Sequence, residues 1–240
     1  MPTFKRDSIE LYYEEFGSGY PLLLFAPGGM RSSIDFWHKS AFDPTKELSS
    51  DFRVIAMDQR NAGSSKAPIG PNDGWGDYTA DHLALLDHLK IDRCHTMGGC
   101  IGSSYCLGLI ERAPQRVSAA VLQNPIGLSP ENRDAFYAMF DDWAKGLRAG
   151  DPSIPEASIA KFRGNMYDGD FVFNVSRDFV RSCQTPLLIL AGSDLYHPTA
   201  TAQEIAKLAP NAELVLSWKT PEEIPQTVKR VRTFLKAHTP

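Results

Sequence analysis

The sequence predicts an α/β fold, because short apolar runs alternate with segments of helical periodicity along most of the chain. Two of these runs, residues 21–26 and 52–57, are almost continuously apolar, which is typical of strands buried on both faces. A third observation is the segment Gly98-Gly99-Cys100-Ile101-Gly102, which follows an apolar stretch and opens a run of small and aliphatic residues. This order predicts a strand, a sharp turn and a helix, around which the rest of the chain is organised.

The spacing Gly98-x-Cys100-x-Gly102 is that of a nucleophile elbow, G-x-S-x-G, with sulfur in place of the usual oxygen. Such a turn requires glycine on both sides, because a Cβ there would collide with the neighbouring strand or helix. A cysteine at a helix N-terminus has its thiol pKa lowered by the helix dipole and by unpaired N–H groups. Cys100 is therefore the candidate nucleophile, and a purely structural glycine turn is the alternative.

Composition limits the classes of function. The 240 residues, 42% of them hydrophobic, are enough for one domain with a modest insertion. A formal net charge of −4 gives no basic surface for nucleic acid or a membrane, and residues 1–7 lack the apolar core of a signal peptide. The four cysteines show no metal-binding or disulfide pattern. We therefore expect a cytoplasmic protein with a small-molecule substrate, no metal and no cofactor, and a homodimer is left open.

The elements can be assigned in order. An antiparallel strand is expected at residues 9–16. It is followed by buried strands, predicted from apolar runs, and by helices, predicted from helical periodicity. The further strands are expected at 21–26, 52–57, 93–97, 116–125, 185–191 and 213–216, and the helices at 79–89, 103–110, 199–208 and 225–237.

The alternation stops between residues 127 and 183, where aromatic residues gather between Pro-containing turns. We predict a helical cap over 127–183, inserted into a core formed by 1–126 and 184–240. An insertion between two core strands often covers the site. The alternative is that its aromatic side chains pack only against one another.

These features together resemble the α/β-hydrolase superfamily along nearly the whole chain. The resemblance is carried by four segments: Pro27-Gly28-Gly29-Met30, Asp58-Gln59-Arg60-Asn61-Ala62-Gly63-Ser64, the Cys100 elbow and Gly192-Ser193-Asp194. It implies a mostly parallel eight-stranded sheet with helices on both faces and catalytic loops at the carboxyl ends of the strands. It also implies Asp194 as the catalytic acid, and an oxyanion hole formed by the N–H groups of Ile101 and of Gly29 or Met30.

Two departures from the family pattern affect the chemistry. Cysteine in the elbow is similar to dienelactone hydrolases and polyhydroxyalkanoate synthases. The loop in which relatives carry the catalytic histidine, residues 217–223, contains no histidine. His197, three residues after Asp194, is our first candidate for the base, and His38 and Lys219 are alternatives.

The function that this pattern favours is acyl hydrolysis or acyl transfer on an activated ester, lactone or thioester. A cysteine already has a small thiolate fraction at neutral pH, so it depends less on a base than serine does. We expect His38, Trp143, Tyr196 and Lys219 to contact the substrate. Two alternatives remain: a binding protein without turnover on the same fold, and a lyase or carbon–carbon bond hydrolase.

Overall fold

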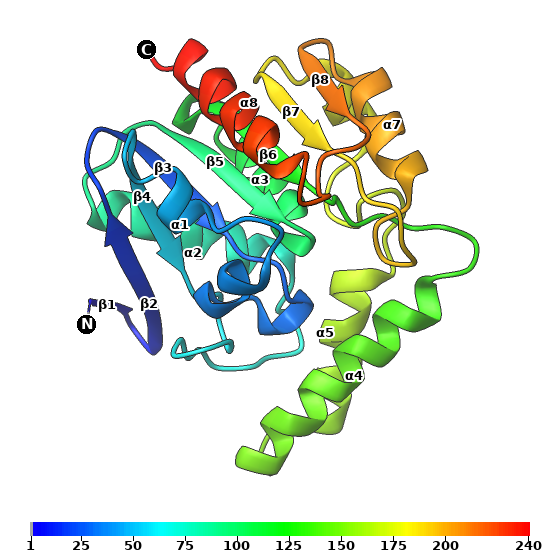
Figure 1. Cartoon of the computed structure of the whole chain (residues 1–240). Coiled ribbons are helices and arrows are strands. Elements are labelled where there is room, and N and C mark those ends of the chain that lie inside the picture. The colour runs from blue at the N-terminus through cyan, green and yellow to red at the C-terminus, as the bar shows by residue number, and fades with distance from the viewer. Residues whose placement is uncertain (1) are drawn as a thin grey trace.

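A computed structural model describes residues 2–240, and a single eight-stranded sheet forms its centre (Figure 1). The strands are β1 (Thr3–Arg6), β2 (Ile9–Phe16), β3 (Tyr20–Phe25), β4 (Phe52–Met57), β5 (Cys94–Gly99), β6 (Val117–Gln123), β7 (Leu187–Leu190) and β8 (Ala212–Val215). Their order in the sheet is β1-β2-β4-β3-β5-β6-β7-β8. The pairs β1–β2 and β2–β4 are antiparallel and all other pairs are parallel. The predicted sheet is confirmed.

The helices follow the strands in alternation. They are α1 (Pro44–Glu47), α2 (Trp75–His88), α3 (Ile101–Arg112), α4 (Arg133–Gly150), α5 (Glu156–Tyr167), α6 (Arg177–Ser182), α7 (Thr199–Leu208) and α8 (Ile224–Ala237). Three short 3-10 helices, η1 (Gly29–Arg31), η2 (Ile34–Lys39) and η3 (Pro114–Arg116), lie in the connections. Across residues 2–240, none of the helices has the length and apolar character needed to cross a membrane.

Both faces of the sheet are covered, as expected. Along β3, Leu22 and Leu24 face the layer that contains α8, whereas Leu23 and Phe25 face the layer that contains α2 and α3. All four side chains are fully buried. Burial on both faces is the physical reason why β3 and β4 appear as almost continuous apolar runs in the sequence.

The segment between β6 and β7 forms helices α4, α5 and α6. Helices α4 and α5 pack against each other, and α4 also contacts η1. Figure 1 shows α4 and α5 beyond the carboxyl ends of the central strands. This is the place expected for a cap, and the division of the chain into core and cap remains our interpretation.

The aromatic side chains of this segment divide into two groups. Phe140 packs edge-on against Trp143 and Phe162, with ring centroids 5.2 and 5.3 Å away. Phe136 stacks on Tyr167, with ring centroids 5.3 Å apart. The first group packs within the segment itself, and the second group contributes to the cavity described below.

Candidate active site

Cys100 lies at the sharp turn between β5 and α3. Its backbone angles, φ 56° and ψ −120°, are ones that side-chain-bearing residues rarely adopt. Such a conformation costs about 1–3 kcal/mol and persists only where the surroundings impose it. The Cys100 N–H donates a 2.8 Å hydrogen bond to the carbonyl of Gln123, which anchors the turn to β6.

The elbow glycines leave the room that this turn needs. A Cβ on Gly98 would lie 2.0 Å from the carbonyl oxygen of Gly102, and a Cβ on Gly102 would lie 2.1 Å from the carbonyl oxygen of Phe25. Both contacts are with backbone atoms, which cannot rotate aside. The steric reason for glycine that we expected from the motif therefore holds at both positions.

Asp194 and His197 form one compact turn after β7. The His197 Nδ1 donates to both carboxylate oxygens of Asp194, at 2.7 and 2.9 Å. The N–H groups of Tyr196 and His197 also donate to Oδ1 of Asp194, at 3.1 and 3.2 Å. A Cβ on Gly192 would lie 2.3 Å from the Cβ of His197, so glycine at 192 makes room for the imidazole.

This arrangement fixes how the imidazole is presented. Because Asp194 accepts from Nδ1, the other ring nitrogen, Nε2, is turned inward. Nε2 is buried and has no hydrogen bond of normal geometry among the described residues. The thiol of Cys100 raises the pKa of His197 through a hydrogen bond and through its charge. Hydrogen bonds between catalytic groups are often long in unliganded enzymes and tighten when substrate binds.

The interaction changes the pKa of both groups. Burial favours the thiol form of Cys100, but the hydrogen bond and charge of His197, with the N–H groups of Ile101 and Gly28, outweigh it and lower the pKa of Cys100. Burial likewise opposes a charged imidazole, yet Cys100 and Asp194 together raise the pKa of His197 to about 9. Each group therefore favours the charged form of the other, the thiolate of Cys100 and the imidazolium of His197.

Two backbone N–H groups help to lower the pKa of the Cys100 thiol. They belong to Ile101, which is one of the expected oxyanion donors, and to Gly28, which precedes the other expected donors Gly29 and Met30 in the same loop. Gly29 lines the site, while the buried side chain of Met30 accepts a 3.6 Å hydrogen bond from the hydroxyl of Tyr167. Residues 29–31 open a 3-10 helix, whose first N–H groups have no acceptor within the helix.

A small cavity of ≈ 220 Å³ lies over Cys100. Its walls come from the elbow, the 28–29 loop, the segment after β6, helices α4 and α5, and the Asp194–His197 turn. The lining residues are Gly28, Gly29, Cys100, Ile101, Ile126, Phe136, Met139, Tyr167, Tyr196 and His197.

Three of the four predicted substrate-contacting residues do not line this cavity. His38 is exposed and its Nδ1 hydrogen-bonds Asp43 at 2.8 Å. Trp143 is buried, and its indole N–H donates to the carbonyl of Asn61 at 3.2 Å, away from the cavity. Lys219 is exposed on the loop after β8. Of the four, only Tyr196 lines the cavity over Cys100.

The loop after β8 has a structural role instead of carrying a histidine. Trp218 is fully buried, and its indole N–H donates a 2.8 Å hydrogen bond to the carbonyl of Ala191, just after β7. The Trp218 carbonyl accepts from the Thr227 hydroxyl at 2.9 Å. This loop therefore supports the base of the turn that carries Asp194 and His197.

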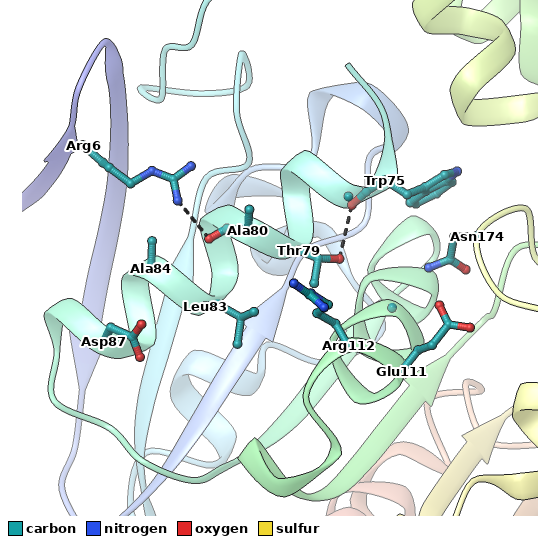
Figure 2. Close-up of a pocket in the computed structure, with 12 residues that line it drawn as sticks. Arg6, Trp75, Thr79, Ala80, Leu83, Ala84, Asp87, Glu111, Arg112 and Asn174 are labelled. Carbon is teal, nitrogen blue, oxygen red and sulfur yellow. Dashed lines mark hydrogen bonds between the residues drawn. The ribbon is translucent and has the colours of Figure 1, made fainter. Parts of the chain in front are cut away.

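A larger surface groove of ≈ 500 Å³ lies between α2 and α3, away from Cys100 (Figure 2). Its charged side chains carry both signs, and two of them are already paired: Arg6 with Asp81 and Asp87 with Arg116. No cysteine or histidine lines it. Cys100 and His197 line the smaller cavity, not this groove.

Comparisons with known proteins agree with the fold. A family model described as alpha/beta hydrolase fold matches residues 21–169. A probable proline iminopeptidase from Leptolyngbya boryana is 34% identical over 137 residues, 55% of this chain and 40% of that protein. A putative carbamate hydrolase RutD from Pseudomonas savastanoi pv. phaseolicola is 28% identical over 231 residues, 82% of this chain and 84% of that protein.

The solved structures are similar over almost the entire chain. The meta-cleavage product hydrolase CumD from Pseudomonas fluorescens IP01 superposes with a TM-score of 0.77 at 18% identity, covering 100% of this chain and 98% of that one. The enol-lactonase from Burkholderia xenovorans LB400 gives 0.70 at 22% identity, covering 98% and 100%. At these identities the structures show the fold alone.

Some sequence relatives are considerably longer than the region they share with this chain. The match covers 40% of the iminopeptidase and 53% of a putative carbamate hydrolase RutD from Variovorax paradoxus. The matched relatives are named as hydrolases or as a peptidase, in agreement with the expected class of enzyme. The reaction itself has to be argued from the site.

Proposed function

This chain belongs to the alpha/beta hydrolase fold family, and we propose that it hydrolyses an activated ester, lactone or thioester through Cys100. One observation carries the proposal. The buried Nε2 of His197 faces the Cys100 thiol while Nδ1 is held by Asp194 at 2.7 Å. The candidate nucleophile therefore lies beside a base, and the base is oriented by a carboxylate, which is the arrangement that covalent acyl transfer requires.

Acylation would proceed from the thiolate. The Cys100 sulfur attacks the substrate carbonyl carbon, an S–C bond forms, and the carbonyl oxygen becomes an oxyanion. The N–H of Ile101 and an N–H of the 28–30 loop stabilise that charge. When the intermediate collapses, the bond to the leaving group breaks and Nε2 of His197 donates its proton to that group.

Deacylation would use the same imidazole as a base. Once the sulfur is acylated it is neutral, so the thiolate charge that helped to hold the proton on His197 is gone. Neutral His197 then accepts a proton from water, which attacks the thioester carbonyl, and the C–S bond breaks to release the acid and the thiolate. If another nucleophile takes the place of water, the same steps amount to acyl transfer.

The active-site geometry weakens the two alternatives considered from the sequence. A binding protein without turnover has no need for a strained Cys100 or for a histidine held by a carboxylate. One relative is named 2-hydroxy-6-oxo-2,4-heptadienoate hydrolase, a protein whose named substrate carries a carboxylate. No Lys or Arg of the described residues lines the cavity here, which disfavours that substrate class.

The pH dependence should reveal how His197 acts. With a substrate whose leaving group needs a proton, such as an ethyl ester, kcat/KM should fall above pH 9, because His197 loses its proton with a pKa of about 9. With a p-nitrophenyl ester, whose leaving group departs without a proton, this alkaline fall should be absent. Both profiles should fall on the acid side as Cys100 is protonated, at a pH below the ordinary thiol pKa.

His197→Gln is the matched variant for this experiment. It removes both the proton donor and the positive charge, so the alkaline fall should disappear and the acid limb should move to higher pH. An alkaline fall of the same size for both leaving groups would contradict the assignment of His197 as the acid. The same conclusion would follow if His197→Gln left the acid limb unchanged.

A further inference from the structure

On the basis of the proposed function, we propose that the acyl group accepted by Cys100 is short, uncharged and apolar. The cavity over the sulfur has a volume of ≈ 220 Å³. Pockets that hold drug-sized ligands have volumes of roughly 300–1,000 Å³, so this cavity suits a smaller acyl group.

The walls of the cavity are apolar and well packed. Ile126 and Phe136 are each 1% exposed, and Tyr167 is fully buried. The ring of Phe136 stacks on Tyr167 and meets Tyr196 edge-on, in both cases with centroids 5.3 Å apart. Three separate elements therefore hold these rings against one another, so the walls cannot move apart without breaking aromatic contacts.

Within the part of the chain that the structure describes, the only cationic group of the cavity lining is His197, which is already engaged by Asp194 and Cys100. Among residues 2–240, no Lys, Arg, Asp or Glu lines the cavity. The nearby Arg133, at the start of α4, donates to the carbonyls of Tyr167 and Gly169. Arg31 is paired with Asp142 at 2.7 Å. A carboxylate on the acyl group would thus leave water without finding a partner, which strongly disfavours its binding.

Met139 sets the length limit. A Cβ on Gly29 would lie 2.6 Å from the sulfur of Met139, so this side chain lies directly over the oxyanion loop. It also lines the cavity and is half-buried. Its replacement by alanine removes three non-hydrogen atoms from the wall and should admit a correspondingly longer acyl chain.

The test compares thioesters of one thiol that differ only in the acyl group. A straight-chain series from acetyl to dodecanoyl measures length, and the isosteric pair 4-methylpentanoyl and succinyl measures charge. We expect kcat/KM to be on the order of 100-fold higher for 4-methylpentanoyl than for succinyl. It should fall about 10-fold or more once the chain exceeds the cavity. Met139→Ala should move the preferred length upward, while Lys145→Ala, on the exposed side of α4, should not.

Two results would overturn the inference: equal use of succinyl and 4-methylpentanoyl, or an unchanged length preference in Met139→Ala. A binding measurement distinguishes a failure of the inferred acyl-group preference from a failure of the proposed function. Calorimetry on the Cys100→Ala variant should show 4-methylpentanamide binding at least about 10-fold more tightly than succinamate. This ranking tests the preference of the cavity for an uncharged group even if no thioester is turned over. Turnover that does not depend on Cys100 would contradict only the assignment of Cys100 as the nucleophile.

Discussion

Replacement of Cys100 by alanine should lower kcat/KM for an activated thioester by about 10⁴-fold or more, because the covalent route is lost. Without the thiolate, the oxyanion donors and His197 could assist only a direct attack of water on the thioester. The site is not arranged for that attack. Steady-state hydrolysis of the 4-methylpentanoyl thioester measures this directly. The variant should fold normally, since alanine keeps the Cβ that the strained turn already accommodates.

Cys183→Ala is the matched control for the loss of a thiol. Cys183 is buried between α6 and β7, outside the cavity, and burial raises its pKa. Its replacement should leave kcat/KM within a few-fold of the unmodified protein. If Cys100→Ala retained more than about one hundredth of the activity, another group would have to be the nucleophile.

Replacement of Gly98 by alanine should destabilise the fold by about 3 kcal/mol or more. The added Cβ would lie 2.0 Å from the carbonyl oxygen of Gly102, and both atoms are fixed by the strand and the helix of the elbow. The turn would therefore have to open, and the Cys100–Gln123 hydrogen bond would be strained with it. Urea unfolding measures the change in the free energy of unfolding, provided that the dependence of this free energy on urea concentration is the same for both proteins.

Gly146→Ala provides the control for this substitution. Gly146 lies exposed within α4 and has no atom within 4 Å of an added Cβ. Alanine there should leave stability unchanged or raise it by up to about 1 kcal/mol, because glycine is a poor helix former. An equal effect at the two positions would show that the elbow does not depend on glycine at 98.

Most of the fold could be predicted because its core strands and helices carry strong patterns. β4 and α7 have the predicted bounds, and the parallel strands were recognised by apolar runs that burial on both faces requires. β1 and α1 were missed, since four residues are too few to show a period. Helix α2 begins earlier than predicted, because Asp77 accepts a 2.9 Å hydrogen bond from the N–H of Gly74 and caps the helix.

The grouping of the candidate residues could be predicted where the chain itself brings them together. Asp194 and His197 are close in sequence, so a single turn is enough to join them. Cys100 was identified by a motif whose glycines have a steric cause. The substrate contacts depend instead on side-chain direction, which packing decides. Trp143 has the expected aromatic character, but its indole N–H is drawn to the Asn61 carbonyl.

The remaining differences have similar causes. His38 follows the oxyanion loop in sequence, but η2 turns its ring toward Asp43 instead of toward Cys100. The N–H of Gly28 helps to lower the pKa of Cys100, although the expected donors of this loop were Gly29 and Met30. Local sequence identifies such a loop but does not determine which amide faces the sulfur.

The most direct measurement of the central claim is the intact mass of the protein shortly after it is mixed with the 4-methylpentanoyl thioester. Cys94 and Cys106 do not compete for the acyl group, since both are buried and burial raises the pKa of each to about 12. We expect a gain of one acyl group, longer-lived in His197→Gln and absent in Cys100→Ala. An acyl group retained by Cys100→Ala, or rapid turnover by that variant, would contradict the assignment of Cys100 as the nucleophile.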